Sequence, residues 1–235
     1  MRESHAAPRL DHVESWVFDL DNTLYPARYN LFDQVDRRIG LFIRDALGID
    51  EDAARRIQKR YFREHGTTLC GLMKLHDVDP HHFLEFVHDI DVTAIPPSVA
   101  LDAALAALPG RKLIFTNGSV KHALRVMARL GVGERFEAVF DIVAADYLPK
   151  PFGAAYDALC AAHGLEPART AMFEDIARNL VPAHALGMTT VWVRTESPWA
   201  QEESDGAHVH HVADNLEEWL TALVERRRSP SPGSR

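Results

Sequence analysis

Two aspartates two residues apart, Asp19 and Asp21, follow directly on an apolar run near the start of the chain. The run, residues 16–18, has the composition of a short buried strand, and alternate residues of an extended chain project to the same face. The two carboxylates can therefore point in the same direction. An Asp-x-Asp pair alone is common at strand ends and in turns, so its meaning depends on which other residues join it.

Three more polar groups lie where a predicted strand or loop leads into a helix. They are Thr116, Asn117, Gly118 and Ser119 after a strand, Lys150 between two prolines, and Glu174 with Asp175 after another strand. Each group has an ordinary explanation on its own, as a helix cap or a solvated loop charge. In open α/β sheets, however, ligands bind beyond the carboxyl ends of the strands. We therefore expect all four groups, the aspartate pair included, to converge on one edge of the sheet.

The combined set is suited to chemistry at a phosphate group. A carboxylate that attacks a phosphate dianion meets a repulsion of about 4 kcal/mol per charge pair near 4 Å at an effective dielectric of 20. A hard divalent cation held by carboxylate oxygens would offset this repulsion, which predicts Mg²⁺ as the cofactor, and the Lys150 ammonium would add a second positive charge. The Thr116 hydroxyl and the backbone N–H of Asn117 or Gly118 can bind phosphate oxygens at the N-terminus of the next helix.

The rest of the sequence predicts the elements that would bring these groups together. Strand and helix patterns alternate, which indicates right-handed crossovers and an α/β fold, a doubly wound, Rossmann-like parallel sheet with helices on both faces. The predicted strands after the first are residues 112–116, 140–143, 170–173, 189–193 and 208–212. The predicted helices that precede or follow them are residues 98–109, 120–130, 152–163, 179–186 and 216–227.

A helical segment interrupts this alternation between the first two strands. Apolar residues recur at helical spacing through residues 31–47, a second helix is predicted at 51–65, and Asp79 followed by Pro80 predicts the start of a further one. We therefore predict a helical cap inserted after the first strand. The predicted division is a flexible arm at 1–15, a core at 16–26 and 95–225, the cap at 27–94 and a disordered tail at 226–235.

The composition limits location and partners. Hydrophobic residues make up 46% of the 235 residues, enough for a substantial core with an insertion. The net charge of −8 argues against sequence-independent binding to nucleic acid or to anionic lipid. No signal-peptide core precedes Trp16 and no run of about 18 apolar residues occurs, so we expect a cytoplasmic protein without a membrane span. The oligomeric state is left open.

The four polar groups resemble the sequence motifs of the haloacid dehalogenase superfamily, in its phosphatase type. Residues 19–23 match the DxDxT signature, Thr116 and Asn117 the second motif, Lys150 the third, and Glu174 with Asp175 the fourth. The match extends from about residue 13 to residue 193, with the motifs in order. This resemblance implies a magnesium-dependent phosphomonoester hydrolase whose substrate is a small phosphate ester.

The resemblance also implies a role for each core residue. Asp19 would be the nucleophile that forms an aspartyl-phosphate, and Asp21 the general acid for the leaving oxygen and then the base for water. Mg²⁺ would be held by the Asp19 carboxylate, the Asp21 backbone carbonyl and Asp175, with Glu174 close by or bound through water. Asn179 would orient the surroundings of the metal. Dehalogenases of the family lack the second aspartate because a halide needs no proton, so Asp21 selects phosphate chemistry.

The predicted cap resembles that of the pyrimidine 5′-nucleotidase branch, in residues 24–26, 31–33, 61–73 and 86–91. A cap of this kind closes over the site and selects the leaving group. Its loop residues His65, Thr67 and Thr68 are the candidates for contact with a base or ribose. The expected substrate is a pyrimidine nucleoside 5′-monophosphate.

Other functions are compatible with the same motifs. A phosphatase for a sugar phosphate or phosphoglycolate would use the same residues, and so would a phosphomutase that returns the phosphoryl group to its substrate. A binding module that kept the fold and lost the reaction is a further alternative. The intact Asp19, Asp21, Lys150 and Asp175 weigh against it.

Overall fold

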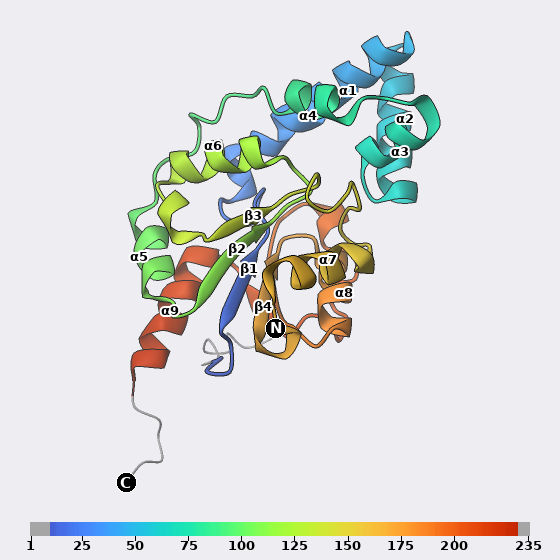
Figure 1. Ribbon diagram of the computed structural model, residues 1–235. Helices are drawn as coiled ribbons and strands as arrows, with labels where there is room; N and C mark the ends of the chain where they lie inside the picture. Colours follow the sequence, from blue (N-terminus) through green and yellow to red (C-terminus); the bar gives the residue numbers. More distant parts are fainter. Residues whose placement is uncertain (1–9, 230–235) are drawn as a thin grey trace.

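Over residues 10–229, which the computed structural model describes, the chain forms a six-stranded parallel sheet in the order β3-β2-β1-β4-β5-β6 (Figure 1). The strands are β1 (Ser15–Phe18), β2 (Arg111–Phe115), β3 (Ala138–Phe140), β4 (Thr170–Glu174), β5 (Thr189–Val193) and β6 (His211–Ala213). β1 lies inside the sheet, and the chain adds strands first on one side of it and then on the other. The doubly wound parallel sheet predicted from the sequence is therefore confirmed.

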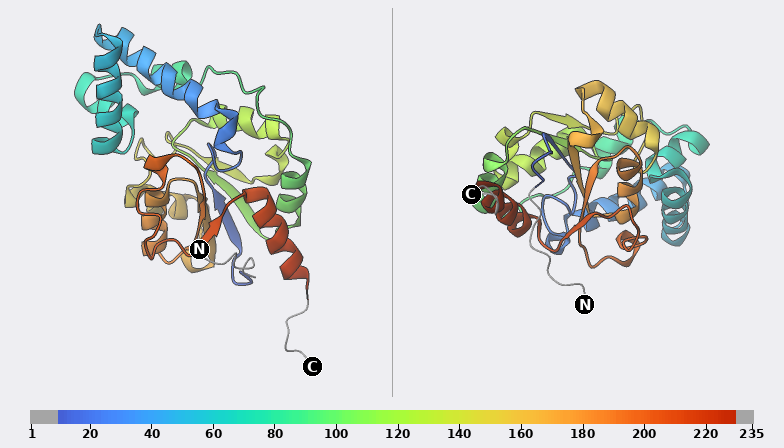
Figure 2. Two further views of the ribbon diagram at one scale, coloured as in Figure 1. Left: turned by 180° about the vertical axis from the view of Figure 1, so that it is seen from behind. Right: turned by 90° about the horizontal axis from the view of Figure 1, so that it is seen from below.

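Helices cover both faces of the sheet (Figures 1 and 2). One face carries α5 (Val99–Ala107), α6 (Val120–Leu130) and α9 (Leu216–Arg228), and the other carries α7 (Gly153–His163) and α8 (Leu180–Ala185). Side chains alternate along β1. Trp16 and Phe18 therefore pack in the core under α5, α6 and α9, and Val17 packs in the core under α7 and α8. No helix in the described part of the chain has the length and apolar character of a membrane span.

Four further helices stand beyond the carboxyl ends of the strands (Figure 1). They are α1 (Leu31–Leu47), α2 (Glu51–His65), α3 (Thr68–His76) and α4 (Pro80–Val87). Three of these helices have an N-cap side chain. Asp50, Thr67 and Asp79 each accept a hydrogen bond from a backbone N–H in the first turn. We propose that these helices form the cap predicted at residues 27–94.

Short 3-10 turns connect several of these elements. They are η1 (Ala27–Tyr29), η2 (Gly133–Arg135), η3 (Pro167–Arg169), η4 (Ala177–Asn179) and η5 (Pro198–Ala200). Two of them adjoin the carboxyl edge of the sheet, since η4 follows β4 and η5 follows β5. They therefore shape the loops around the pocket described below.

The predictions for the two ends of the chain are wrong in part. Leu10 and Val13 are buried in the core, and Glu14 donates its N–H to the Arg169 oxygen at 2.8 Å, so residues 10–15 are not a flexible arm. The three arginines at 226–228 form the last turn of α9 instead of beginning a disordered tail. Cations are favoured there by the helix dipole. Residues 1–9 and 230–235 lie outside the described residues.

Two predicted strands are displaced by side-chain hydrogen bonds to the backbone. β3 ends at Phe140 rather than at residue 143, because the Asp141 carboxylate accepts from the N–H groups of Val120 and Ala144 and turns the chain. β6 begins at His211 rather than at residue 208. Before it, the Thr190 hydroxyl donates to the His208 oxygen at 2.6 Å in place of a strand ladder.

Gly110 offers a test of how tightly the chain is packed at the starts of β1 and β2. It has a left-handed φ of +87°, and a Cβ added there would lie 2.1 Å from the Glu14 oxygen. We expect Gly110→Ala to lower the free energy of unfolding by more than the roughly 1–2 kcal/mol of a left-handed alanine. Gly131→Ala is the matched control, with φ +78° and nothing within 4 Å, and should lose only that amount. Equal losses in urea unfolding would show that the Glu14 contact is not tight.

Candidate active site

The carboxyl ends of β1, β2 and β4 are level at one edge of the sheet, because Phe18 pairs with Ile114 on one side and with Phe173 on the other. A pocket of about 140 Å³ lies at this edge and is also lined by residues of α1, α2, α3 and α4. Its lining includes the core residues identified in the sequence, namely Asp19, Asp21, Thr116, Asn117, Gly118, Lys150, Glu174, Asp175 and Asn179. Segments far apart in the sequence thus share one pocket.

The Lys150 ammonium lies at the centre of the acidic residues. Its Nζ donates to Asp19 Oδ1 at 2.6 Å, to Glu174 Oε2 at 2.6 Å and to the Phe115 backbone oxygen at 2.9 Å. Burial by itself would lower the pKa of Lys150, but the charges of the two carboxylates outweigh burial and raise this pKa. Asn117 fixes the loop, since its amide accepts from the Lys150 N–H at 2.9 Å and donates to the Lys150 oxygen at 3.2 Å.

Three buried carboxylates surround this single ammonium. Oxygens of Asp19, Glu174 and Asp175 lie within 4.8 Å of one another. Burial and the Glu174 charge raise the pKa of Asp19 to about 7, and burial with the charges of Glu174 and Asp19 raises the pKa of Asp175 well above its usual value. Buried oxygens that repel one another in this way fit a hard divalent cation such as Mg²⁺. Asn179, buried at the end of η4, lines the same pocket.

Asp21 has different surroundings, although it follows Asp19 by two residues. His122 Nε2 lies 2.8 Å from its Oδ1, and the Tyr25 hydroxyl donates to the same oxygen. Burial would raise the pKa of Asp21, but the charge and hydrogen bond of His122, together with the Tyr25 hydrogen bond, outweigh burial and lower this pKa. One strand end therefore presents two carboxylates with opposite protonation tendencies.

The residues expected to bind phosphate interact locally at the start of α6. The Gly118 N–H donates to the Thr116 Oγ1 at 2.9 Å, and the Ser119 side chain accepts from the His122 N–H at 3.3 Å. Thr116 acts as an acceptor in its bond, so its own hydroxyl hydrogen can serve an anion. The Asn117 side-chain amide holds the Lys150 backbone, and the predicted role of the Asn117 backbone N–H at a phosphate stays a prediction.

The three candidate residues in the helical segment lie at different distances from the chemistry. Thr67 and Thr68 line the pocket, yet Thr67 caps α3 through the Cys70 N–H, and the Thr68 hydroxyl donates to the Gln58 oxygen at 3.2 Å. His65 is not part of this lining and instead packs its ring against Tyr61, with centroids 5.6 Å apart. Both threonine hydroxyls therefore stabilise the helices in this structure.

Tyr25 and His122 lie outside the four motifs, and neither is predicted from the sequence as a site residue. For His122 a signal was present in the sequence. On α6 the positions 122, 126 and 130 recur at helical spacing and are all buried, and the other two are Val126 and Leu130. A histidine on an otherwise apolar buried stripe, one turn into the helix that follows the second motif, indicates a polar partner in the core.

The raised pKa values predict how the stability of the metal-free protein depends on pH. A carboxyl whose pKa is raised on folding stabilises the protein below its unfolded pKa of about 4, and this contribution is lost as pH rises through the folded value. For Asp19 that interval ends at about 7. Removing one of the repelling groups by Asp175→Asn should therefore make the variant gain stability over the wild type as pH rises.

The comparison is made by urea unfolding in EDTA at about pH 5 and about pH 8. Glu137→Gln is the control, because Glu137 pairs with Arg111 at 2.7 Å in a partly exposed ion pair. That variant should gain nothing at the higher pH. If the free energy of unfolding of Asp175→Asn differs from that of the wild type by the same amount at both pH values, the predicted repulsion is contradicted.

Comparisons with known proteins agree with this geometry. The sequence profile of the haloacid dehalogenase-like hydrolases matches residues 16–187. Phosphate metabolism protein 8 of Saccharomyces cerevisiae is 27% identical over 191 residues, which cover 74% of this chain and 59% of that protein. The chain thus spans less than two thirds of the length of this relative.

Solved structures share the fold. The HAD phosphatase from Thermococcus onnurineus and CbbY from Rhodobacter sphaeroides in complex with phosphate each superpose with a TM-score of 0.61 at 18% identity. Each comparison covers 90% of this chain, with 98% of the first structure and 99% of the second. Since the profile match extends over most of the chain and includes all four motifs, the chain belongs to the haloacid dehalogenase-like hydrolases.

Proposed function

We propose that the protein is a Mg²⁺-dependent phosphomonoester hydrolase that works through an aspartyl-phosphate on Asp19. The observation that carries the proposal is the division of labour at the end of β1. Asp19 lies in a cluster suited to a cation and touches Lys150, while Asp21 lies beside hydrogen-bond donors in the same pocket. Two neighbouring carboxylates in unlike surroundings suit a nucleophile and a proton-transfer group.

In the proposed first step an oxygen of Asp19 forms a bond to phosphorus while the bond between phosphorus and the leaving oxygen breaks. The leaving oxygen takes a proton from Asp21. Lys150 neutralises part of the charge on the nucleophile and on the phosphate. The Thr116 hydroxyl and the backbone N–H of Asn117 are the proposed donors to phosphate oxygens, since the Gly118 N–H already donates to Thr116 Oγ1. These residues hold the ester in line with the attacking oxygen.

In the second step Asp21 takes a proton from water as the water oxygen bonds to phosphorus. The bond between phosphorus and Asp19 then breaks, which regenerates the carboxylate and releases phosphate. The lowered pKa of Asp21 in the free protein suits this base role. For the first step, a phosphate dianion beside Asp21 would raise its pKa again, because like charges favour the protonated form.

Asp19, Asp175 and the Asp21 backbone carbonyl are the proposed ligands of Mg²⁺, with Glu174 at the edge of the set. When bound, the ion would offset the repulsion between the carboxylates and the phosphate. The fit rests on the buried oxygens of Asp19, Glu174 and Asp175, which lie close together. Among residues 10–229, Lys150 is the one ammonium that pairs with this set. Asn179 would orient this surrounding.

The proposed substrate is a pyrimidine nucleoside 5′-monophosphate. Besides the resemblance of the helical segment, an aromatic pair at the pocket supports this choice. Phe62 of α2 and Trp199 of η5 line the pocket edge to face, with ring centroids 6.0 Å apart, and the Arg178 guanidinium lies 4.6 Å from the Phe62 ring centroid. Aromatic faces of this kind suit the base of a nucleotide. Such a soluble substrate is consistent with the cytoplasmic location expected from the sequence.

Asp19→Asn tests the nucleophile. The change is nearly isosteric, but an amide cannot attack phosphorus, so we expect turnover of 4-nitrophenyl phosphate with Mg²⁺ to fall to background and no phosphoenzyme to be trapped. Thermal melting should show an intact fold. EDTA should abolish wild-type turnover, and added Mg²⁺ should restore it. A variant that keeps most of the activity would rule out this nucleophile.

A substrate panel tests the proposed specificity. We expect higher kcat/KM for uridine and cytidine monophosphates than for purine nucleotides, ribose 5-phosphate and phosphoglycolate. Phosphate release is measured directly, because a phosphomutase would instead return the group to a second position of the sugar. Equal values across the panel would remove the pyrimidine assignment and leave the phosphatase. No turnover of any ester would indicate a binding module.

A further inference from the structure

The side chain of Asp21 is held by a histidine that belongs to none of the four motifs. His122 Nε2 lies 2.8 Å from Oδ1 and 3.1 Å from Oδ2 of Asp21, and His122 is fully buried. We propose that His122 is a positioning residue that fixes the Asp21 carboxyl in the orientation required for proton transfer. This inference rests on the proposed function of Asp21 as general acid and base.

The hydrogen bonds distinguish the two carboxylate oxygens of Asp21. The Tyr25 hydroxyl and His122 Nε2 both approach Oδ1, whereas Oδ2 lies at the longer distance from His122. Rotation of the carboxyl group would break both bonds to Oδ1. Oδ2 is therefore the oxygen that exchanges its proton with the leaving oxygen and with water.

The imidazole is arranged to donate to Asp21. Its Nδ1 is buried and has no hydrogen-bond partner among the described residues. A carboxylate oxygen only accepts hydrogen bonds, so Nε2 carries a hydrogen in this contact. His122 is thus a fixed donor to Asp21.

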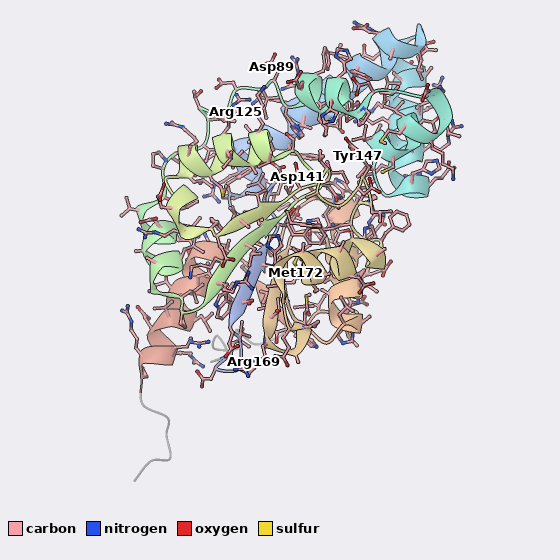
Figure 3. All side chains as sticks on the ribbon, in the orientation of Figure 1. Asp89, Arg125, Asp141, Tyr147, Arg169 and Met172 are labelled. Atoms are coloured by element: carbon pink, nitrogen blue, oxygen red, sulfur yellow. The ribbon has the colours of Figure 1, made fainter. Side chains whose placement is uncertain are left out.

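The orientation of the His122 ring is itself fixed by its neighbours. His88 stacks on it with centroids 4.5 Å apart and an interplanar angle of 10°. The Ser119 hydroxyl bonds to His88 Nδ1 at 3.0 Å. Arg125 of α6, labelled in Figure 3, donates to the His88 oxygen at 2.8 Å and to the Ile90 oxygen at 2.6 Å. The segment after α4 therefore packs His88 on the His122 ring and fixes the orientation of that ring.

A positioning role predicts an effect that depends on the leaving group. General acid catalysis contributes about 10²–10⁴-fold when the leaving oxygen needs a proton, and little when the leaving group is already stable as an anion. Phenyl phosphate and 4-nitrophenyl phosphate are close in shape but differ in this need. Loss of orientation at Asp21 should therefore slow the first ester more than the second, whereas general damage to the pocket would slow both alike.

The experiment compares His122→Leu, which removes the donor, with His122→Gln, whose amide N–H can reach Asp21. With Mg²⁺ present, we expect His122→Leu to lower kcat/KM by about 10-fold or more on phenyl phosphate and by about 2-fold on 4-nitrophenyl phosphate. His122→Gln should recover most of the loss. His163→Leu, at the far end of α7 and outside the pocket lining, is the control and should match the wild type. Thermal melting checks that each variant is folded.

The outcomes separate this inference from the proposed function. Equal losses on the two esters, or no recovery in a folded His122→Gln variant, would overturn the positioning role while the phosphatase stands. A wild-type protein that hydrolyses neither ester with Mg²⁺ would overturn the proposed function and this inference together. A leaving-group-dependent loss with recovery by glutamine supports the inference.

Discussion

The excess of negative charge buried at the end of β1 is the constraint on which the rest of the site depends. Asp19, Glu174 and Asp175 lie close together, and within the described residues Lys150 is the one ammonium that pairs with this set, through Asp19 and Glu174. Buried charges are costly unless they are paired and hydrogen-bonded. The arrangement is therefore incomplete as a purely structural ion pair. Binding of a cation together with an anionic ligand would lower the electrostatic cost of burying these charges, because the cation offsets the carboxylates and the phosphate alike.

The same constraint explains why the loops around the sheet are held so firmly. Lys150 reaches the carboxylates because Asn117 bonds to both backbone groups of that residue, so the loop after β2 sets the position of the loop before α7. Asp141 likewise joins the turn after β3 to the start of α6. A displacement of one of these loops would therefore change the distances between Lys150 and the buried carboxylates.

The helical segment between β1 and α5 affects the site from two directions. Residues of α1 to α4 line the pocket opposite the sheet, and the segment after α4 brings His88 onto the ring beside Asp21. In the proposed reaction, the stretch of chain that encloses the leaving group also supplies His88, which packs on the His122 ring beside the proton donor Asp21. Under that proposal, this segment links substrate selection to proton transfer.

Local patterns in the sequence determined the parallel α/β sheet, the helical insertion and the residues at the strand ends, because hydrophobic periodicity and caps depend on near neighbours. They did not determine that Leu10 and Val13 are core residues, that β3 and β6 are displaced, or that His65 faces Tyr61. Above all, the contact between Asp21 and His122 joins residues 101 positions apart. Only the tertiary structure decides such a contact, because it depends on how helix α6 packs on the sheet, and that packing follows from the whole core.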